Sequence, residues 1–252
     1  MARFQDRVAL VTGGASGIGK SAALLFAREG AKVAIGDLDS EGGLATVREI
    51  SRNGGQAIFL RTDVSQPSDM EALVARTVEA WGRLDLALNN AGIGHDPSLT
   101  HEITEETWER VISTNLKGVW LGLKYELPVM KKQGSGAIVN TSSIGGLIVG
   151  KGLAAYSAAK GGVNQLTKIT ALEYAEFGIR VNAVCPSVVL TPLTERTMRE
   201  SPGIIKDMIA NQPMGRLANA EEVASAIIWL CSGEASYING VCLPVDGGFT
   251  VA

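Results

Sequence analysis

The chain has 252 residues with 23 basic and 26 acidic side chains, a formal net charge of −3. This length suits one large α/β domain spanning residues 1–252, and no linker divides it. The mild acidic balance argues against nucleic acid or an acidic membrane surface as the partner. No apolar stretch approaches membrane-spanning length and no signal-peptide region opens the chain, so we expect a cytoplasmic protein.

Short β-branched runs alternate with helical segments along the whole chain. Most of the runs are continuously apolar, which is typical of a parallel sheet covered on both faces. The alternation predicts right-handed βαβ units and therefore a doubly wound α/β fold. The expected strands are Val8–Val11, Lys32–Ile35, Ala57–Leu60, Leu84–Leu88, Ala137–Asn140, Arg180–Val184 and Val241–Pro244.

Three of the intervening helices are well defined by their periodicity. The segment Ser65–Gly82 has one apolar stripe, and we expect Ser65 to cap its start and Gly82 to stop it. A longer helix runs from Glu105 to about Lys131. The third, Ala155–Phe177, begins with many small residues, which fit packing on its own sheet and a subunit interface equally well.

The turn between the first strand and the next helix is rich in glycine. Gly13, Gly17 and Gly19 have the spacing Gly-x-x-x-Gly-x-Gly within Thr12–Gly19. A strand, a tight glycine turn and a helix N-terminus together hold a pyrophosphate on backbone N–H groups. The alternative is a glycine-rich loop that binds nothing.

Asp37 ends the second strand, 18 residues after Gly19. A carboxylate at this place accepts both hydroxyls of an adenosine ribose and repels the 2′-phosphate of NADP. No Arg or Lys lies within residues 13–19, and Leu38 follows the aspartate. We therefore expect NAD as the cofactor, although Asp37 could instead only cap a turn.

Tyr156 and Lys160 are four residues apart and lie on one helix face. A fixed ammonium beside a phenol favours phenolate, so the pairing predicts a lowered tyrosine pKa and an acid/base role. Ser143 comes 13 residues earlier, at the carboxyl end of the fifth strand, where doubly wound proteins bind ligands. Ser142 competes with Ser143 for this place.

These features in this order resemble the short-chain dehydrogenase/reductase family over essentially the whole chain. The resemblance implies a seven-stranded Rossmann sheet and a homotetramer assembled through the two long helices. The matching motifs are Thr12-Gly13-x-x-x-Gly17-Ile18-Gly19, Asp63-Val64, Asn89-Asn90-Ala91-Gly92, Asn115, Ser143, Tyr156-x-x-x-Lys160 and Thr191 after Pro186.

The resemblance also implies a role for each catalytic position. Tyr156 would exchange a proton with the substrate oxygen, and Ser143 would hydrogen-bond the same oxygen. Lys160 would bind the nicotinamide ribose and lower the tyrosine pKa, and Asn115 would hold a water molecule that links Lys160 to solvent. Ser143 and Tyr156 are thus the expected substrate contacts.

A larger set of residues is expected to contact the cofactor. It comprises the glycine turn, the end of the second strand, the turn after the fourth strand, the catalytic helix and the loop after the sixth strand. The set is Gly13, Ser16, Gly17, Ile18, Gly19, Asp37, Leu38, Asp63, Val64, Asn89, Ala91, Gly92, Tyr156, Lys160, Pro186, Val189 and Thr191. One departure is Pro186-Ser187, where many relatives have Pro-Gly, so this loop is expected to differ slightly.

Residues 190–214 fall where the family has its substrate lid. Their apolar side chains would close over an uncharged substrate, or would pack as an ordinary amphipathic segment. They are Leu193, Met198, Ile204, Ile205 and Met208.

The histidines and cysteines give no sign of a metal site. His101 is expected on a surface loop, and His95 either there or at the rim of the pocket. The odd number and wide spacing of Cys185, Cys231 and Cys242 favour neither disulfides nor zinc.

The function expected from the sequence is an NAD-dependent oxidoreductase that interconverts a secondary alcohol and a ketone. A resemblance to cyclic-alcohol and dihydrodiol dehydrogenases and the apolar lid favour a cyclic or bulky aliphatic substrate. Two alternatives stay open: an NADPH-dependent 3-oxoacyl reductase, and a catalytically silent Rossmann protein that senses its cofactor.

Overall fold

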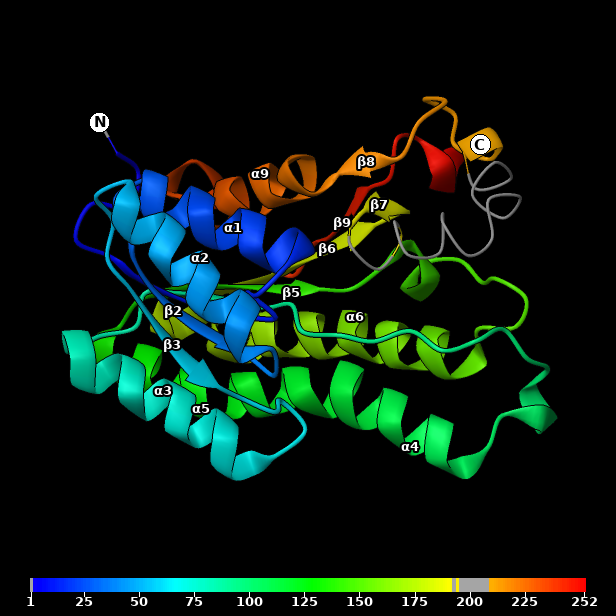
Figure 1. Ribbon diagram of the computed structural model, residues 1–252, viewed down its shortest axis with the longest axis horizontal. Helices are drawn as coiled ribbons and strands as arrows, with labels where there is room; N and C mark the ends of the chain where they lie inside the picture. The colour runs from blue at the N-terminus through cyan, green and yellow to red at the C-terminus, as the bar shows by residue number, and fades with distance from the viewer. Residues whose placement is uncertain (1, 192–193, 195–208) are drawn as a thin grey trace.

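Seven parallel strands form the central sheet, as the sequence predicts, and their order is β3-β2-β1-β4-β5-β6-β9. The computed structural model describes residues 2–191, 194 and 209–252 (Figure 1). The strand order reverses between β1 and β4, and this switch point opens a crevice at the carboxyl ends of the strands. The strands are β1 (Val8–Thr12), β2 (Lys32–Asp37), β3 (Ala57–Arg61), β4 (Leu86–Asn89), β5 (Gly136–Thr141), β6 (Ile179–Pro186) and β9 (Cys242–Val245).

Helices cover both faces of the sheet, because nearly every residue of the inner strands is apolar and buried. In Figure 1, α1, α2 and α9 lie on one face, and α3, α4, α5 and α6 lie on the other. Each face has its own apolar cluster. The helices are α1 (Gly17–Arg28), α2 (Ser40–Arg52), α3 (Pro67–Trp81), α4 (Glu105–Ile112), α5 (Gly118–Gln133), α6 (Ala154–Tyr174) and α9 (Ala220–Cys231).

The start of α3 differs from the prediction, whereas its end agrees with it. Pro67 occupies the first helical position and Gln66 the cap position, so the prediction of Ser65 as the cap is wrong. The Ser65 hydroxyl instead donates to the Asp63 carboxylate at 2.7 Å. Gly82 ends the helix with a left-handed φ of 76°, as predicted.

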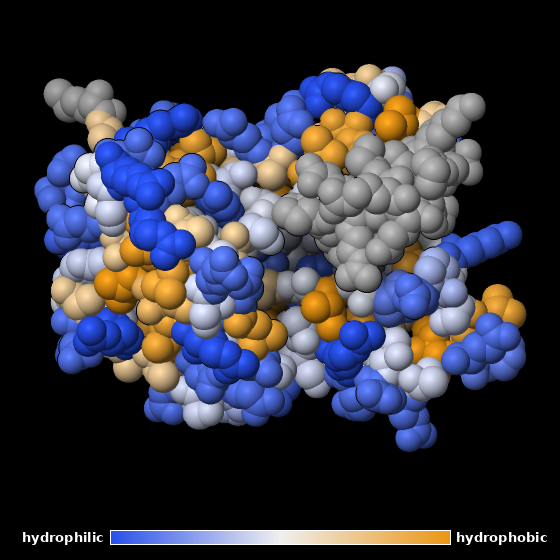
Figure 2. All heavy atoms as spheres, in the orientation of Figure 1, coloured by the Kyte–Doolittle hydropathy of each residue, from blue (hydrophilic) through white to orange (hydrophobic). Residues whose placement is uncertain are grey.

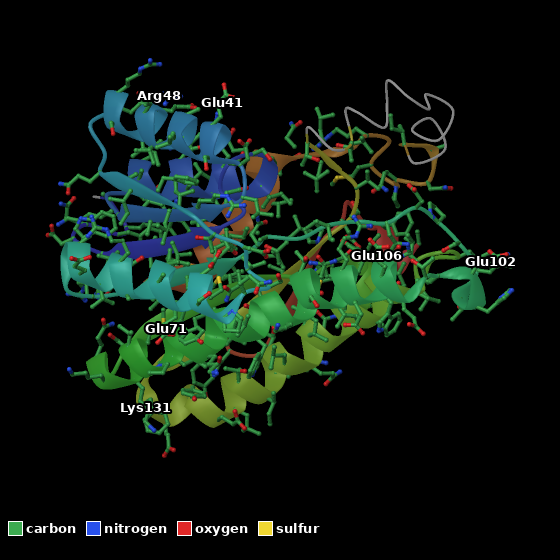
Figure 3. The ribbon with its side chains drawn as sticks, turned by 60° about the horizontal axis from the view of Figure 1, so that its bottom comes forward. Glu41, Arg48, Glu71, Glu102, Glu106 and Lys131 are labelled. Carbon is green, nitrogen blue, oxygen red and sulfur yellow. The ribbon has the colours of Figure 1, made fainter. Side chains whose placement is uncertain are left out.

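The long helix predicted from Glu105 to about Lys131 is present but interrupted. A π-helical turn, Ser113–Lys117, separates α4 from α5. Such turns occur frequently at functional sites. In Figure 3, α4 and α5 run beside α6, and Lys131 is labelled near the end of α5. Lys131 Nζ lies 3.9 Å from the centroid of the Phe177 ring.

Small residues at the start of α6 serve the fold of this chain. Ala155 and Ala159 are completely buried and pack around Val111 of α4. Close packing inside the chain thus accounts for these two positions, whereas Ala158 is exposed.

A two-stranded parallel sheet, β7 (Val189–Leu190) with β8 (Ala218–Asn219), was not predicted. Its two strands pair the start of the segment 190–214 with residues just after the end of that segment. The predicted apolar lid residues Leu193, Met198, Ile204, Ile205 and Met208 lie outside the described residues.

A buried polar chain crosses the core between the two long helices. The Asn89 amide nitrogen donates to Glu126 Oε2 and to Asn140 Oδ1, both at 3.1 Å. Asn140 in turn donates to the Thr167 hydroxyl at 3.0 Å. All four side chains are at most 2 % exposed, so they tie α5, β4, β5 and α6 together by hydrogen bonds rather than apolar contact.

Glu126 makes the unfolding free energy depend on pH. Burial raises its pKa to about 7, and the Asn89 amide only partly opposes the rise. The unfolded chain releases this proton near pH ~4.3, so the contribution to stability is present below that pH and is lost as the pH rises through ~7. As the pH rises from ~4 to ~8, the unfolding free energy of Glu126→Gln, measured in urea, should therefore increase by about 3 kcal/mol relative to that of wild type. Unfolding free energies of wild type and Glu126→Gln that change in parallel with pH would contradict this prediction.

Candidate active site

The glycine turn leaves room for a ligand at the N-terminus of α1. Gly13 and Gly17 have φ of 69° and 53°, and a Cβ at Gly19 would collide with the Gly13 carbonyl oxygen. Among the described residues, the Ser16 side chain makes no capping hydrogen bond to α1. The first N–H groups of the helix are therefore available to an anion, and the turn fits the pyrophosphate of a dinucleotide.

Asp37 lies beside this turn and fastens it to β2. One carboxylate oxygen accepts from Ala15 N at 2.9 Å, and the other accepts from Asp39 N at 3.0 Å. The Asp37 carboxylate therefore caps a turn, which is the alternative role that the sequence allowed. Each oxygen keeps a second lone pair, so the group can also accept the hydroxyls of a ribose. Leu38, next in the chain, is 55 % exposed.

The turn after β4 is held to β1 and β5 by side-chain hydrogen bonds. The Thr12 hydroxyl accepts from the backbone N–H groups of Asn90 and Ala91 at 3.0 and 3.2 Å. The Asn90 amide donates to the Thr12 and Gly13 carbonyl oxygens at 3.2 and 3.3 Å and accepts from Thr141 at 3.2 Å. Asn90 was not among the predicted site residues, although the motif Asn89–Gly92 was recognised. Asn89 was predicted to contact the cofactor, but its side chain belongs to the buried polar chain.

Asn115 lies in the π-helical turn and is completely buried. Its side chain accepts from Ile93 N and donates to Ile93 O, each at 2.8 Å, so it holds the chain just after Gly92. A Cβ at Gly92 would lie 3.2 Å from Asn115 Oδ1 and 3.6 Å from Lys160 Nζ. The structure therefore brings Asn115, Gly92 and Lys160 together.

Ser143, Tyr156 and Lys160 meet at the carboxyl end of β5. Lys160 Nζ lies 5.7 Å from the centroid of the Tyr156 ring and donates to the Thr141 carbonyl oxygen at 2.8 Å. The Ser143 hydroxyl accepts from Gly145 N at 3.1 Å. A Cβ at Gly145 would be 3.5 Å from both Ser143 Oγ and Tyr156 Cε1, so the serine and the tyrosine flank the same small space.

Ser142 and Ser143 have different positions. Ser142 is buried, and its hydroxyl donates to the Lys160 carbonyl oxygen at 3.0 Å, away from the tyrosine. The geometry thus favours Ser143 as the residue that contacts substrate. A further anchor, not predicted, is the Asn164 amide, which donates to the Gly146 carbonyl oxygen at 2.9 Å. Its only signal in the sequence is its place one turn after Lys160.

The pKa shifts differ from the expectation. Burial raises the pKa of Tyr156, and the neighbouring Ser143 hydroxyl opposes that rise, so the predicted lowering by Lys160 is wrong. Burial also lowers the pKa of Lys160 to about 8. The ammonium is itself desolvated and is bound to the Thr141 carbonyl oxygen, so it does not dominate the field at the phenol.

The remaining predicted residues lie on the loop after β3 and at or after the end of β6. Val64 is buried, and a Cβ at Gly118 would lie 2.8 Å from Val64 Cγ2. The Asp63 carboxylate accepts from Ser65 N at 2.9 Å. A Cβ at Gly17 would be 3.2 Å from Thr191 Cγ2, so Thr191 stands across from the glycine turn. Pro186 and Val189 are buried beside Thr191.

The unusual Ser187 makes a contact that glycine lacks. It avoids a positive φ, as expected for serine, and its hydroxyl donates to Gln212 Oε1 at 3.1 Å. This bond links the loop after β6 to the end of the 190–214 segment.

Fold and site together define a Rossmann-type oxidoreductase, with a dinucleotide cradle beside a phenol, an ammonium and a hydroxyl. Residues 13–250 match the family described as "Enoyl-(Acyl carrier protein) reductase". The chain is 44% identical to the cyclohexanol dehydrogenase of Acinetobacter sp. (strain SE19), over 98% of this chain and 96% of that protein. It is 45% identical to the cis-4-hydroxycyclohexanecarboxylate dehydrogenase of Sinomonas cyclohexanicum, over 98% of each.

A solved structure agrees with these matches. The crystal structure of levodione reductase superposes with a TM-score of 0.95 at 39% identity, over 99% of this chain and 100% of that one. The chain belongs to the short-chain dehydrogenase/reductase family. It is therefore an oxidoreductase that acts on CH–OH groups with a nicotinamide cofactor. None of the helices in the described ranges is long and apolar enough to cross a membrane.

The two adjacent serines give a matched test of the site. Ser143→Ala removes the hydroxyl beside Tyr156, so kcat should fall by ~10²-fold, while loss of the hydrogen bond from Gly145 N should lower the unfolding free energy by about 0.5–1 kcal/mol. Ser142→Ala removes the buried hydrogen bond to the Lys160 carbonyl oxygen, so the unfolding free energy should fall by about 1–2 kcal/mol while most turnover remains. Steady-state kinetics and urea unfolding of both variants decide this, and the reverse pattern would contradict the assignment.

Proposed function

We propose that this protein is an NAD-dependent oxidoreductase that interconverts a cyclic secondary alcohol and the corresponding ketone. The observation that carries the proposal is the meeting of Ser143, Tyr156 and Lys160 beside the glycine turn. The names of two relatives, a cyclohexanol dehydrogenase and a hydroxycyclohexanecarboxylate dehydrogenase, support a cyclic substrate.

Each residue of the proposed active site has its own role in cofactor binding, substrate binding or proton transfer. The nicotinamide, when bound, supplies the acceptor or donor of hydride. The glycine turn and Asp37 hold the dinucleotide, and Lys160 binds its ribose. The Ser143 hydroxyl hydrogen-bonds the substrate oxygen and orients it toward Tyr156, which takes the alcohol proton during oxidation and returns it during reduction.

The proton balance of Tyr156 and Lys160 sets the pH dependence. Alcohol oxidation requires a group that can take up the alcohol proton, either a Tyr156 phenolate or a neutral Lys160 that accepts the proton passed on from Tyr156. Because burial lowers the pKa of Lys160 to about 8 while it raises that of Tyr156, the lysine loses its proton first, near pH 8.

Alcohol oxidation should therefore rise with pH and level off above about 8. In Lys160→Met the phenol must ionise alone, and its raised pKa should keep the rate increasing beyond pH ~9. Lys168→Met, which changes an exposed lysine of the same helix, should keep the wild-type profile. The measurement is kcat against pH with saturating cofactor. Identical profiles for wild type and Lys160→Met would contradict the claim that Lys160 sets the pH dependence of alcohol oxidation.

NAD is the proposed cofactor because Asp37 borders the turn. The runner-up, an NADPH-dependent 3-oxoacyl reductase, would need a cation for the 2′-phosphate, and within residues 13–19 and at Leu38 there is none. A catalytically silent sensor is disfavoured because Asn115, Ser143, Tyr156 and Lys160 are all present.

Wild type should prefer NAD over NADP by at least ~10-fold in kcat/KM, since carboxylate and phosphate repel each other. Asp37→Ala combined with Leu38→Arg should reverse or abolish the preference, because it removes the repulsion and adds a charge-assisted partner. Leu38→Ala alone is the control and should leave NAD preferred. A wild-type preference for NADP would refute the cofactor assignment.

We also propose a cytoplasmic homotetramer. Four large apolar side chains of the two long helices, Trp108, Trp120, Ile169 and Leu172, are at least 39 % exposed. On the face that Figure 2 shows, apolar residues are scattered among polar ones. Burial of the exposed side chains of α4, α5 and α6 between subunits would remove them from water.

A further inference from the structure

His95 carries an unmet hydrogen-bond acceptor. Its Nδ1 lies 2.8 Å from the Asp96 carbonyl oxygen, and a carbonyl oxygen only accepts, so Nδ1 carries the proton. In the neutral ring, Nε2 then holds a lone pair and needs a donor. Nε2 is buried and has no hydrogen-bond partner within the described part of the chain. Buried acceptors are rarely left without partners, so Nε2 is free to accept from a donor supplied by water or by a ligand.

The segment around His95 is fixed at both ends by parts of the active site. Ile93 is held by Asn115 through two hydrogen bonds of 2.8 Å, and Ile93 packs in the same apolar cluster as Tyr156. Ser98 N donates to the Gly152 carbonyl oxygen at 3.1 Å, and a Cβ at Gly152 would be 2.8 Å from Pro97 Cβ.

Gly152 belongs to the connection that leads from Ser143 to Tyr156. In Figure 1, the connections β4–α4 and β5–α6 lie at the same end of the sheet, where the strands end. His95 therefore belongs to a segment that is bound to Asn115 at Ile93 and to the loop after Ser143 at Ser98.

We propose that His95 Nε2 accepts a hydrogen bond from a second hydroxyl group of the substrate, distinct from the oxygen held by Ser143 and Tyr156. The substrate class is then a cyclic diol, or a cyclic ketone that carries a hydroxyl. This inference rests on the proposed function, because the reacting oxygen must be at Tyr156 for the second one to reach His95. A site that hydrogen-bonds a hydroxyl discriminates against the analogue that lacks it, since the polar group of the protein is left unpaired.

The test compares cyclohexanol with cyclohexane-1,2-, 1,3- and 1,4-diol. Wild type should oxidise at least one diol with a kcat/KM ~10-fold above that of cyclohexanol. His95→Phe keeps a ring of similar size without nitrogen, so it should lose that preference and change cyclohexanol oxidation by less than ~3-fold. His95→Asn supplies an amide oxygen as acceptor and should recover part of the preference.

The control is His101→Phe, which changes the other of the two histidines, an exposed residue, and should behave as wild type. A wild type that prefers no diol, or a His95→Phe variant that loses both activities equally, overturns the inference. A wild type that oxidises no alcohol contradicts the proposed function instead. Calorimetric titration with the diols and cyclohexanol then tests His95 separately: loss of diol preference in His95→Phe supports its role, and equal binding overturns it.

Discussion

The site depends on how the β5–α6 connection is fastened to helix α6. Lys160 Nζ holds the Thr141 carbonyl oxygen, the Ser142 hydroxyl holds the Lys160 carbonyl oxygen, and Asn164 holds the Gly146 carbonyl oxygen, at 2.8, 3.0 and 2.9 Å. Ser143 lies between these anchors. Because Tyr156 is on the same helix, the serine–tyrosine geometry is set by buried hydrogen bonds, which is the preorganisation that acid/base catalysis requires.

Polar side chains play the same part across the switch point of the sheet. Asn90 and Thr12 bind the carboxyl ends of β1 and β4 to each other, and Asn115 reaches from a π-helical turn to hold Ile93. The crevice walls are thus joined by directional bonds rather than by apolar contact alone. The desolvation that makes these bonds strong also lowers the pKa of Lys160 and raises that of Tyr156.

Much of the fold and the site could be predicted because its signals are local. Continuous apolar runs indicated the strands, the glycine turn indicated the cradle, and the spacing of Tyr156 and Lys160 indicated the acid/base helix. The π-helical turn was not predicted, because the helical pattern runs on through Ser113–Lys117, and the hydrogen bonds from Asn115 to Ile93 exist only in the folded chain. The direction of the Tyr156 pKa shift was also missed, because burial is a property of the folded chain and outweighs the nearby charge. The spacing of 13 residues to Tyr156 favoured Ser143 over Ser142 by family resemblance, but only the folded chain shows that the two hydroxyls have opposite orientations.

The most direct test of the account compares Tyr156→Phe with wild type in two assays, NADH formation with a panel of cyclic secondary alcohols and binding of NADH by fluorescence titration. The variant keeps the ring and loses only the exchangeable proton. The account predicts that NADH binds with near wild-type affinity while kcat falls by ~10²–10⁴-fold. Near-normal turnover in Tyr156→Phe would show that another group carries the proton, and would contradict the central claim.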